Sequence, residues 1–156
     1  MKFFGIDPGL TATGYGVVER IGNRLIPIDW GVIRSGKGVL AERLERIYTG
    51  LTAKLSEHHP DIVAIEEIFT GRNPRSALLV GHARGVALLA GALGGCPVQE
   101  YAATVVKQAV VGNGRASKQQ VAFMVGKLLN LQDQSLPADA SDALGIAICC
   151  LFRSKV

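Results

Sequence analysis

The 156-residue sequence is poor in the features that mark secreted and zinc-finger proteins. It has only three cysteines, Cys96, Cys149 and Cys150, and none of them forms a CxxC motif or a Cys/His pair with zinc spacing. We interpret them as small apolar side chains of a protein in a reducing compartment, which excludes a disulfide-stabilised class. Charged residues make up 19% and hydrophobic residues 48%, the composition of a folded, soluble protein.

A long uncharged apolar run is also lacking. The most apolar stretch, residues 77–93, is interrupted by His82 and Arg84, so it falls short of the roughly 18 apolar residues of a membrane span. The first nine residues, MKFFGIDPG, reach an acidic side chain and a Pro-Gly turn too early for a secretory signal. We therefore expect a cytoplasmic protein that does not associate with a membrane.

Acidic residues are nearly absent from the middle of the chain. Residues 1–67 hold eight basic and nine acidic side chains, whereas residues 68–132 hold one acid, Glu100. A basic segment on a net charge of +4 indicates a surface that neutralises phosphates, although a solvated face would give the same pattern. The seven basic residues of the segment are Arg72, Arg75, Arg84, Lys107, Arg115, Lys118 and Lys127.

Hydrophobic periodicity and turn signals predict five strands and five helices in one domain spanning residues 1–156. The expected strands cover 2–7, 15–20, 25–34, 61–68 and 97–101; the expected helices cover 40–55, 74–93, 102–111, 117–130 and 137 to the end. Short connections between the first three strands favour an antiparallel meander, and helical crossovers favour parallel addition of the last two. The order predicts an α/β protein with a five-stranded mixed sheet covered by helices on both faces, the layout of the ribonuclease H-like fold.

Four of the thirteen carboxylates stand at unusual positions. Asp7 and Glu66 each end an apolar strand, and Asp139 and Asp142 share one face of an otherwise apolar helix. Ionised carboxylates beside apolar surface are costly unless a cation offsets them. Arg or Lys partners are one solution, and ordinary turn or helix-end chemistry would explain Asp7 or Asp139 singly. Gathered together, the four would suit Mg²⁺ or Mn²⁺, with two ions acting in phosphodiester hydrolysis.

Several sequence blocks together resemble one known family. GIDPG, TGYGV, AIEEIF, ARGVA, VKQAVVGNGRASK and DASDALGIAI occur in the order found in the RuvC Holliday-junction resolvases, over essentially the whole chain. GIDPG alone is weakly specific, whereas the last two blocks together are strongly specific.

The resemblance implies a junction-resolving endonuclease with a DNA recombination and repair role. The resemblance further implies that the catalytic, Mg²⁺-binding carboxylates are Asp7, Glu66, Asp139 and Asp142. Family members can carry histidine at the position of Asp139. It also implies that Lys107 and Lys118 lie near the scissile phosphate, that Phe69 contacts bases, and that the protein is a homodimer working with the RuvA–RuvB branch-migration motor. We add Arg72, Arg75 and Arg115 as DNA-binding residues, from the basic segment.

Three alternatives stand beside this reading. A ribonuclease H-like nuclease of the YqgF type, acting on RNA, shares the GIDPG-like start but not the lysine blocks. A binding module without catalysis would not need all four carboxylates. An actin-like ATPase would need a second phosphate-binding loop and a longer chain. We expect His58, His59 and His82 to be surface or helix-end residues, because no metal spacing links them.

Overall fold

A computed structural model gives the fold and describes residues 1–68 and 73–155. Each predicted element is present with the predicted type, and the boundaries differ by a few residues. The elements are β1 (Lys2–Asp7), β2 (Ala12–Ile21), β3 (Arg24–Arg34), α1 (Leu40–His58), β4 (Ile62–Glu66), α2 (Pro74–Leu93), β5 (Val98–Tyr101), α3 (Ala103–Val111), α4 (Lys118–Leu128) and α5 (Ala138–Arg153).

The five strands form one mixed sheet in the order β3-β2-β1-β4-β5. The first three strands pair antiparallel as a meander, whereas β4 pairs parallel to β1 and β5 pairs parallel to β4. This confirms the predicted ribonuclease H-like fold. The short turns force the antiparallel pairs, and α1 and α2 act as the crossovers that return the chain for the parallel strands.

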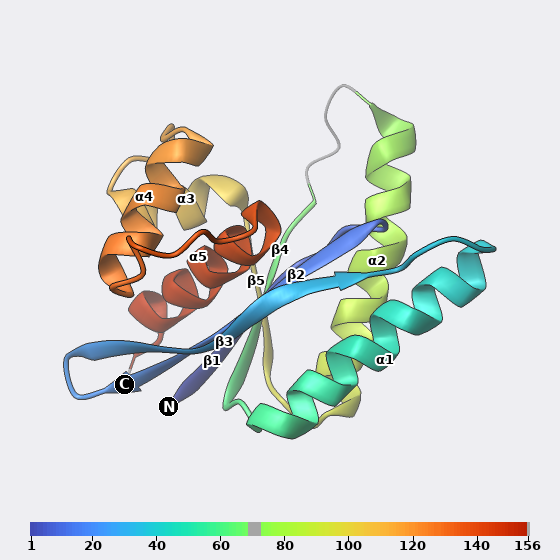
Figure 1. Cartoon of the computed structure of the whole chain (residues 1–156), viewed down its shortest axis with the longest axis horizontal. Helices are drawn as coiled ribbons and strands as arrows, with labels where there is room; N and C mark the ends of the chain where they lie inside the picture. The colour runs from blue at the N-terminus through green and yellow to red at the C-terminus, as the bar shows by residue number, and fades with distance from the viewer. Residues whose placement is uncertain (69–72, 156) are drawn as a thin grey trace.

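Helices cover both faces of the sheet, as Figure 1 shows, with α1 and α2 on one side and α3, α4 and α5 on the other. Because side chains alternate along a strand, neighbouring residues of β1 enter different cores. Phe3 packs into the core under α5, and Phe4 packs into the core under α1 and α2. Both phenylalanines are fully buried, and each contributes roughly 1.5–3 kcal/mol through burial.

Helix α5 approaches the sheet unusually closely, because glycines lie beneath it. A methyl group on Gly14 would overlap the backbone carbonyl of Asp139, and one on Gly5 would overlap that of Ala143. At these two positions the backbones of strand and helix lie too close together for any side chain to fit, so only glycine is possible. The sequence blocks GIDPG and TGYGV therefore fix the distance between the sheet and the first turns of α5.

Two predicted helix starts are confirmed. The Asn73 side chain accepts a hydrogen bond from the Ser76 amide at 3.2 Å, with Pro74 in the first turn of α2. Ser117 and Gln120 form a capping box at the start of α4, with hydrogen bonds of 3.1 and 2.8 Å.

Helix α2 corrects one expectation from the sequence. Despite His82 and Arg84, this helix of 20 residues contains an 18-residue window with a mean hydropathy of 1.5, which makes it long and apolar enough to cross a membrane, by length and composition alone. The average tolerates two polar interruptions that we expected to exclude such a span. Only 22% of this window is buried, and Leu78, Leu89 and Leu93 are more than half exposed.

Candidate active site

A small cavity at the carboxyl ends of β1 and β4 brings three of the four predicted carboxylates together. The parallel register pairs Ile6 with Ile65, so the next residues, Asp7 and Glu66, end their strands side by side. Helix α5 adds Asp142 from its second turn, and the three line a cavity of about 140 Å³. The cavity joins residues from opposite ends of the chain.

Asp139 does not line this cavity among the described residues. It lies in the first turn of α5, three residues before Asp142, and is partly buried. Its charge still affects the site. Burial raises the pKa of Asp142, Lys118 lowers it, and repulsion from Asp139 raises it further. The sequence predicted the pair on one face of a helix but could not tell which member faces the cavity.

The carboxylates of the cavity are crowded and hard to ionise. Burial raises the pKa of Asp7 to about 8, and repulsion from Glu66 and Asp142 adds to the effect. Burial likewise raises the pKa of Glu66, with further repulsion from Asp142, and burial raises that of Asp142. Hard oxygen donors that repel one another in this way fit a divalent cation, which would offset their charge.

Two lysines, which the family resemblance placed near the scissile phosphate, complete the polar lining of the cavity. Lys107 comes from α3 and Lys118 from the first turn of α4. The Lys118 ammonium lies 3.6 Å from a carboxylate oxygen of Asp142, but its side chain is 83% exposed. Such an exposed pair adds little stability, so Lys118 is free to turn toward an anion entering the cavity.

The turn between α3 and α4 is held by Gln108. Its side-chain amide donates to the carbonyl of Gly112 at 3.1 Å, and its side-chain carbonyl accepts from the Gly114 amide at 3.1 Å. Gly112 adopts a left-handed conformation, with φ of 85°, which glycine allows at little cost. Gln108 thereby fixes the spacing between the helices that carry Lys107 and Lys118.

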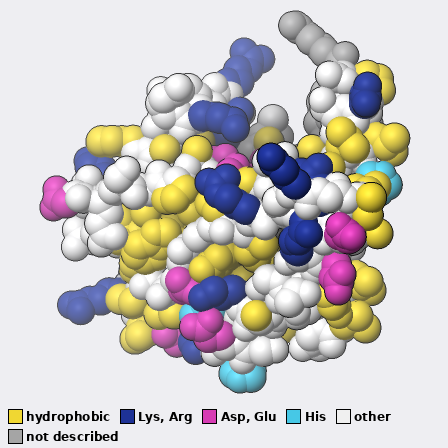
Figure 2. All heavy atoms as spheres, turned by 45° about the vertical axis from the view of Figure 1, so that its right-hand side comes forward, with side chains coloured by type: hydrophobic (Ala, Val, Ile, Leu, Met, Phe, Trp, Pro, Cys, Tyr) yellow, Lys and Arg dark blue, Asp and Glu magenta, His cyan; other side chains and the backbone are white. Residues whose placement is uncertain are grey.

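Of the other four predicted DNA-binding residues, the structure describes two. Arg75, in the first turn of α2, and Arg115, in the α3–α4 turn, are both exposed. Phe69 and Arg72 lie outside the described residues. In Figure 2, Lys and Arg side chains gather in the upper half of the face in view, the half toward which β1 and β4 run in Figure 1.

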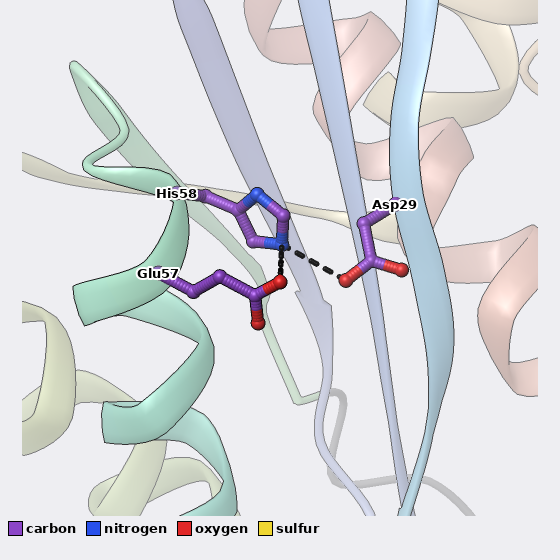
Figure 3. Close-up of side chains that lie close together, drawn as sticks. All are labelled: Asp29, Glu57 and His58. Carbon is purple, nitrogen blue, oxygen red and sulfur yellow. Dashed lines mark hydrogen bonds and ion pairs between the residues drawn. The ribbon is translucent and has the colours of Figure 1, made fainter.

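A second group of possible metal ligands lies away from the cavity, between β3 and α1. Asp29, Glu57 and His58 point toward one another in Figure 3, with ligand atoms within 4.8 Å. The His58 ring nitrogen lies 2.9 Å from an Asp29 oxygen. The Lys54 ammonium already lies 2.8 Å from Asp29 and 3.0 Å from Glu57. This cation already offsets part of the negative charge that a metal ion would meet, so we interpret the group as an ion-pair network that fastens α1 to the sheet.

His58 is buried at the end of α1. The helix-end prediction was therefore right for this residue, and the surface alternative was wrong. The reason lies in Asp29, which comes from a strand far away in sequence, so spacing along the chain could not reveal the contact. The sequence analysis also missed Gln108 and Gly14. Gln108 acts through its hydrogen bonds to the α3–α4 turn, and Gly14 through its contact with α5, and neither contact is visible in the sequence.

Comparisons with known proteins identify the family. The family model described as "Crossover junction endodeoxyribonuclease RuvC" matches residues 3–150. The RuvC of Geotalea uraniireducens is 53% identical over 150 residues, which cover 96% of this chain and 87% of the relative.

Two solved structures agree with this. Thermus thermophilus RuvC has a TM-score of 0.88 and 37% identity, covering 97% of this chain and 94% of that one. The T. thermophilus RuvC in complex with Holliday junction substrate has a TM-score of 0.91 and 37% identity, covering 97% and 93%. With the family model matching nearly all of the sequence, the chain belongs to the RuvC family of crossover junction endodeoxyribonucleases.

Proposed function

We propose that this protein is a crossover junction endodeoxyribonuclease that resolves four-way DNA junctions by paired symmetric nicks. The observation that carries the proposal is the cavity in which Asp7, Glu66 and Asp142 meet beside Lys107 and Lys118. The similar T. thermophilus RuvC, whose structure holds a Holliday junction substrate, supports the choice of substrate. Family membership supports hydrolysis of the DNA backbone.

The donor set fits divalent metal ions. Asp7, Glu66 and Asp142 would hold Mg²⁺, for which Mn²⁺ can substitute, and Asp139, whose charge acts on Asp7 and Asp142, would complete the set. Two bound ions would supply Lewis-acid activation of water and offset the charge on the phosphate. The raised pKa values support this, because a cation would restore the ionised carboxylates at neutral pH.

The protein's own residues then position the DNA. Lys107 and Lys118 would hold the scissile phosphate and stabilise the charge that builds up on it during in-line displacement. Arg75 and Arg115, with Phe69 and Arg72 from the segment outside the described residues, would hold the junction arms. Their contacts with phosphates would make binding strongly salt-dependent.

We further propose a C2 homodimer, because one chain has one such cavity and paired nicks need two. The exposed apolar side of α2 supports this: Leu78 is 66%, Leu89 52% and Leu93 66% exposed. Burying these side chains against a second copy would remove them from water. On family grounds the RuvA–RuvB branch-migration complex would be its partner, in the cytoplasm.

The test uses an immobile four-way junction and a plain duplex of the same sequence, each with Mg²⁺ or with a chelator. We expect ligatable nicks at symmetric positions in the junction only, and only with Mg²⁺. Cleavage of an RNA–DNA hybrid in preference to the junction would support the RNA-directed alternative. Tight junction binding without cleavage under any divalent metal would support a binding module.

A further inference from the structure

A second basic surface lies at the same end of the sheet as the nuclease cavity, at the corner where β3 passes into α1. Strands β1 and β3 both pair antiparallel to β2, so they run in the same direction and end at the same edge. In Figure 1 the β1–β2 turn and the start of α1 both lie toward the right. We call Thr11 and residues 35–46 the β3–α1 corner. None of them lines the nuclease cavity.

Arg43, in the first turn of α1, reaches back to the turn that follows Asp7. Its Nε donates to the Ser35 hydroxyl at 3.1 Å, and an outer nitrogen donates to the Thr11 hydroxyl at 3.4 Å. The Ser35 hydroxyl in turn donates to the Leu10 carbonyl. These contacts use two of the five N–H donors of the guanidinium group, and Arg43 forms no ion pair in the described part of the chain. Neutral oxygens therefore orient the group and leave donors for an anion.

Lys37 lies in the loop before α1 and is exposed. Gly36 and Gly38, on either side of it, have φ of 65° and 128°, a conformation that glycine adopts without strain. Arg46 donates hydrogen bonds to the backbone carbonyls of Ser35 and Lys37. These contacts fix the backbone of the loop, and the Lys37 ammonium group forms no ion pair with any residue that the structure describes.

The corner keeps a positive charge after its internal ion pair is counted. The Arg46 guanidinium lies 3.9 Å from a carboxylate oxygen of Glu42, so this acid offsets the charge of Arg46. Glu45 is two residues from Arg43 on the helix, and side chains at that spacing do not face each other. Lys37 and Arg43 are therefore available to pair with an anion from outside the chain.

The corner lies within reach of a DNA strand bound at the carboxylates. Gly14 pairs with Asp7, and Thr11 precedes Gly14 by three residues. One strand spacing of about 4.8 Å and three residues of about 3.3 Å each put Thr11 roughly 11 Å from Asp7. A DNA strand carries one phosphate about every 3.4 Å of helix axis, so this distance spans about three phosphates. Lys107 and Lys118 come from helices that follow β5, the sheet edge opposite β3, so the two basic regions lie on either side of the carboxylates.

We infer that Thr11, Lys37 and Arg43 bind backbone phosphates of the DNA arm that leaves the nuclease cavity past the β1–β2 turn. The inference rests on the proposed function and extends its DNA contacts beyond the basic segment of residues 68–132. The planar guanidinium group of Arg43 suits a phosphate. The Thr11 hydroxyl accepts a hydrogen bond from Arg43 and can donate its own hydrogen to the same anion. Since Asp7 faces α5 and Arg43 comes from α1, this arm lies across the end of the sheet.

The test measures how binding of a fluorescein-labelled four-way junction depends on salt. The full chain is titrated into the junction with a chelator present, so that no cleavage occurs, and anisotropy is followed. Each phosphate contact contributes about 0.9 to the slope of log Kd against log salt concentration. We expect Lys37→Ala and Arg43→Ala each to reduce this slope by about 0.9 and to weaken binding roughly five- to tenfold at low salt. Arg24→Ala, which removes an exposed arginine at the other end of β3, is the matched control and should leave the slope unchanged.

Two further measurements separate phosphate binding from a role in folding or in the chemical step. Arg43→Lys keeps the charge but not the fork of donors, so it should keep the slope and lose part of the affinity. With Mg²⁺ and saturating protein, single-turnover cleavage by Lys37→Ala should stay within about twofold of the unmodified rate, because a contact made equally in the ground and transition states changes binding alone. Thermal melting establishes that each variant is folded.

Two results would overturn the inference and leave the proposed function in place. One is an unchanged slope in both alanine variants while they still cleave the junction. The other is an equal loss of slope in Arg24→Ala, which would show that only net charge matters. Failure of the unmodified protein to bind the junction at all would instead remove the proposed function, and the contact at the β3–α1 corner with it.

Discussion

Asp7 carries its carboxyl group at the end of an apolar strand, where its ionised form is costly without a cation. Asp7→Asn or Glu66→Gln removes a proposed metal ligand and a charge that repels phosphate. We expect junction cleavage with Mg²⁺ to fall at least about 100-fold, while junction affinity is kept or increased. Gel shift and single-turnover cleavage measure the two effects. The matched control is Glu67→Gln, one residue past β4 and outside the cavity lining, which should cleave normally. Parallel loss of binding and cleavage would show a structural role for these acids.

The Asp29 carboxylate, unlike that of Asp7, already has partners in the protein, Lys54 and His58. Burial pushes its pKa up, but hydrogen bonds from Lys54 and His58 outweigh burial and hold the pKa below its ordinary value. The stabilisation from Asp29 is therefore present above the unfolded-state pKa near 4 and is lost as the pH falls through the lower folded-state value.

Asp29→Asn should therefore destabilise the protein at pH 7 by on the order of 1 kcal/mol. The difference from the unmodified protein should shrink as the pH falls below about 4. Urea unfolding at several pH values measures it. Asp133→Asn, at an exposed position outside any helix or strand, is the control and should show neither effect. A difference independent of pH would mean that the network contributes packing and not charge.

At the scale of elements, α5 depends on the glycines beneath it. Gly14→Ala forces the first turn of α5, which carries Asp139, away from β2. We expect the Mg²⁺ concentration for half-maximal cleavage to rise, because Asp139 and Asp142 then move away from Asp7. Gly91→Ala, which crowds the Val98 side chain beneath α2 and does not touch α5, is the control: it should lower the melting temperature, yet leave the Mg²⁺ requirement of the folded fraction unchanged. The same Mg²⁺ requirement in both variants would remove Gly14 from any positioning role.

The sequence predicts the helices and strands better than it predicts the contacts between them. The fold followed from periodicity and turn signals, and Asp7 and Glu66 were recognised because each ends an apolar strand. Which of Asp139 and Asp142 faces the cavity depends on the rotation of α5, which Gly5 and Gly14 set by contact. The pairing of Asp29 with His58 likewise joins a strand to a helix whose relative register no local pattern encodes. That the carboxylates are catalytic stays a prediction until the variants are measured.

At the scale of the whole molecule, the exposed side of α2 predicts an assembly. Leu89→Glu places a charge in the proposed contact between two copies, where burial of an unpaired charge is costly. We expect sedimentation to show a dimer for the unmodified protein and a monomer for this variant, with paired nicking lost. Val39→Glu changes an equally exposed apolar side chain before α1 and should stay dimeric. A monomer that still nicks both strands in one binding event would contradict the dimer.

The cavity also has a consequence for the life of the protein in the cell. Its carboxylates come from β1, β4 and α5, so a chain still on the ribosome lacks Asp142 until α5 has been made. Folding during synthesis proceeds from the amino terminus, and the sheet meander can form early without any complete metal site. A truncated or unfinished product would therefore hold two of the three lining acids at most. Under the proposed function, a fragment that lacks α5 should therefore leave DNA uncut.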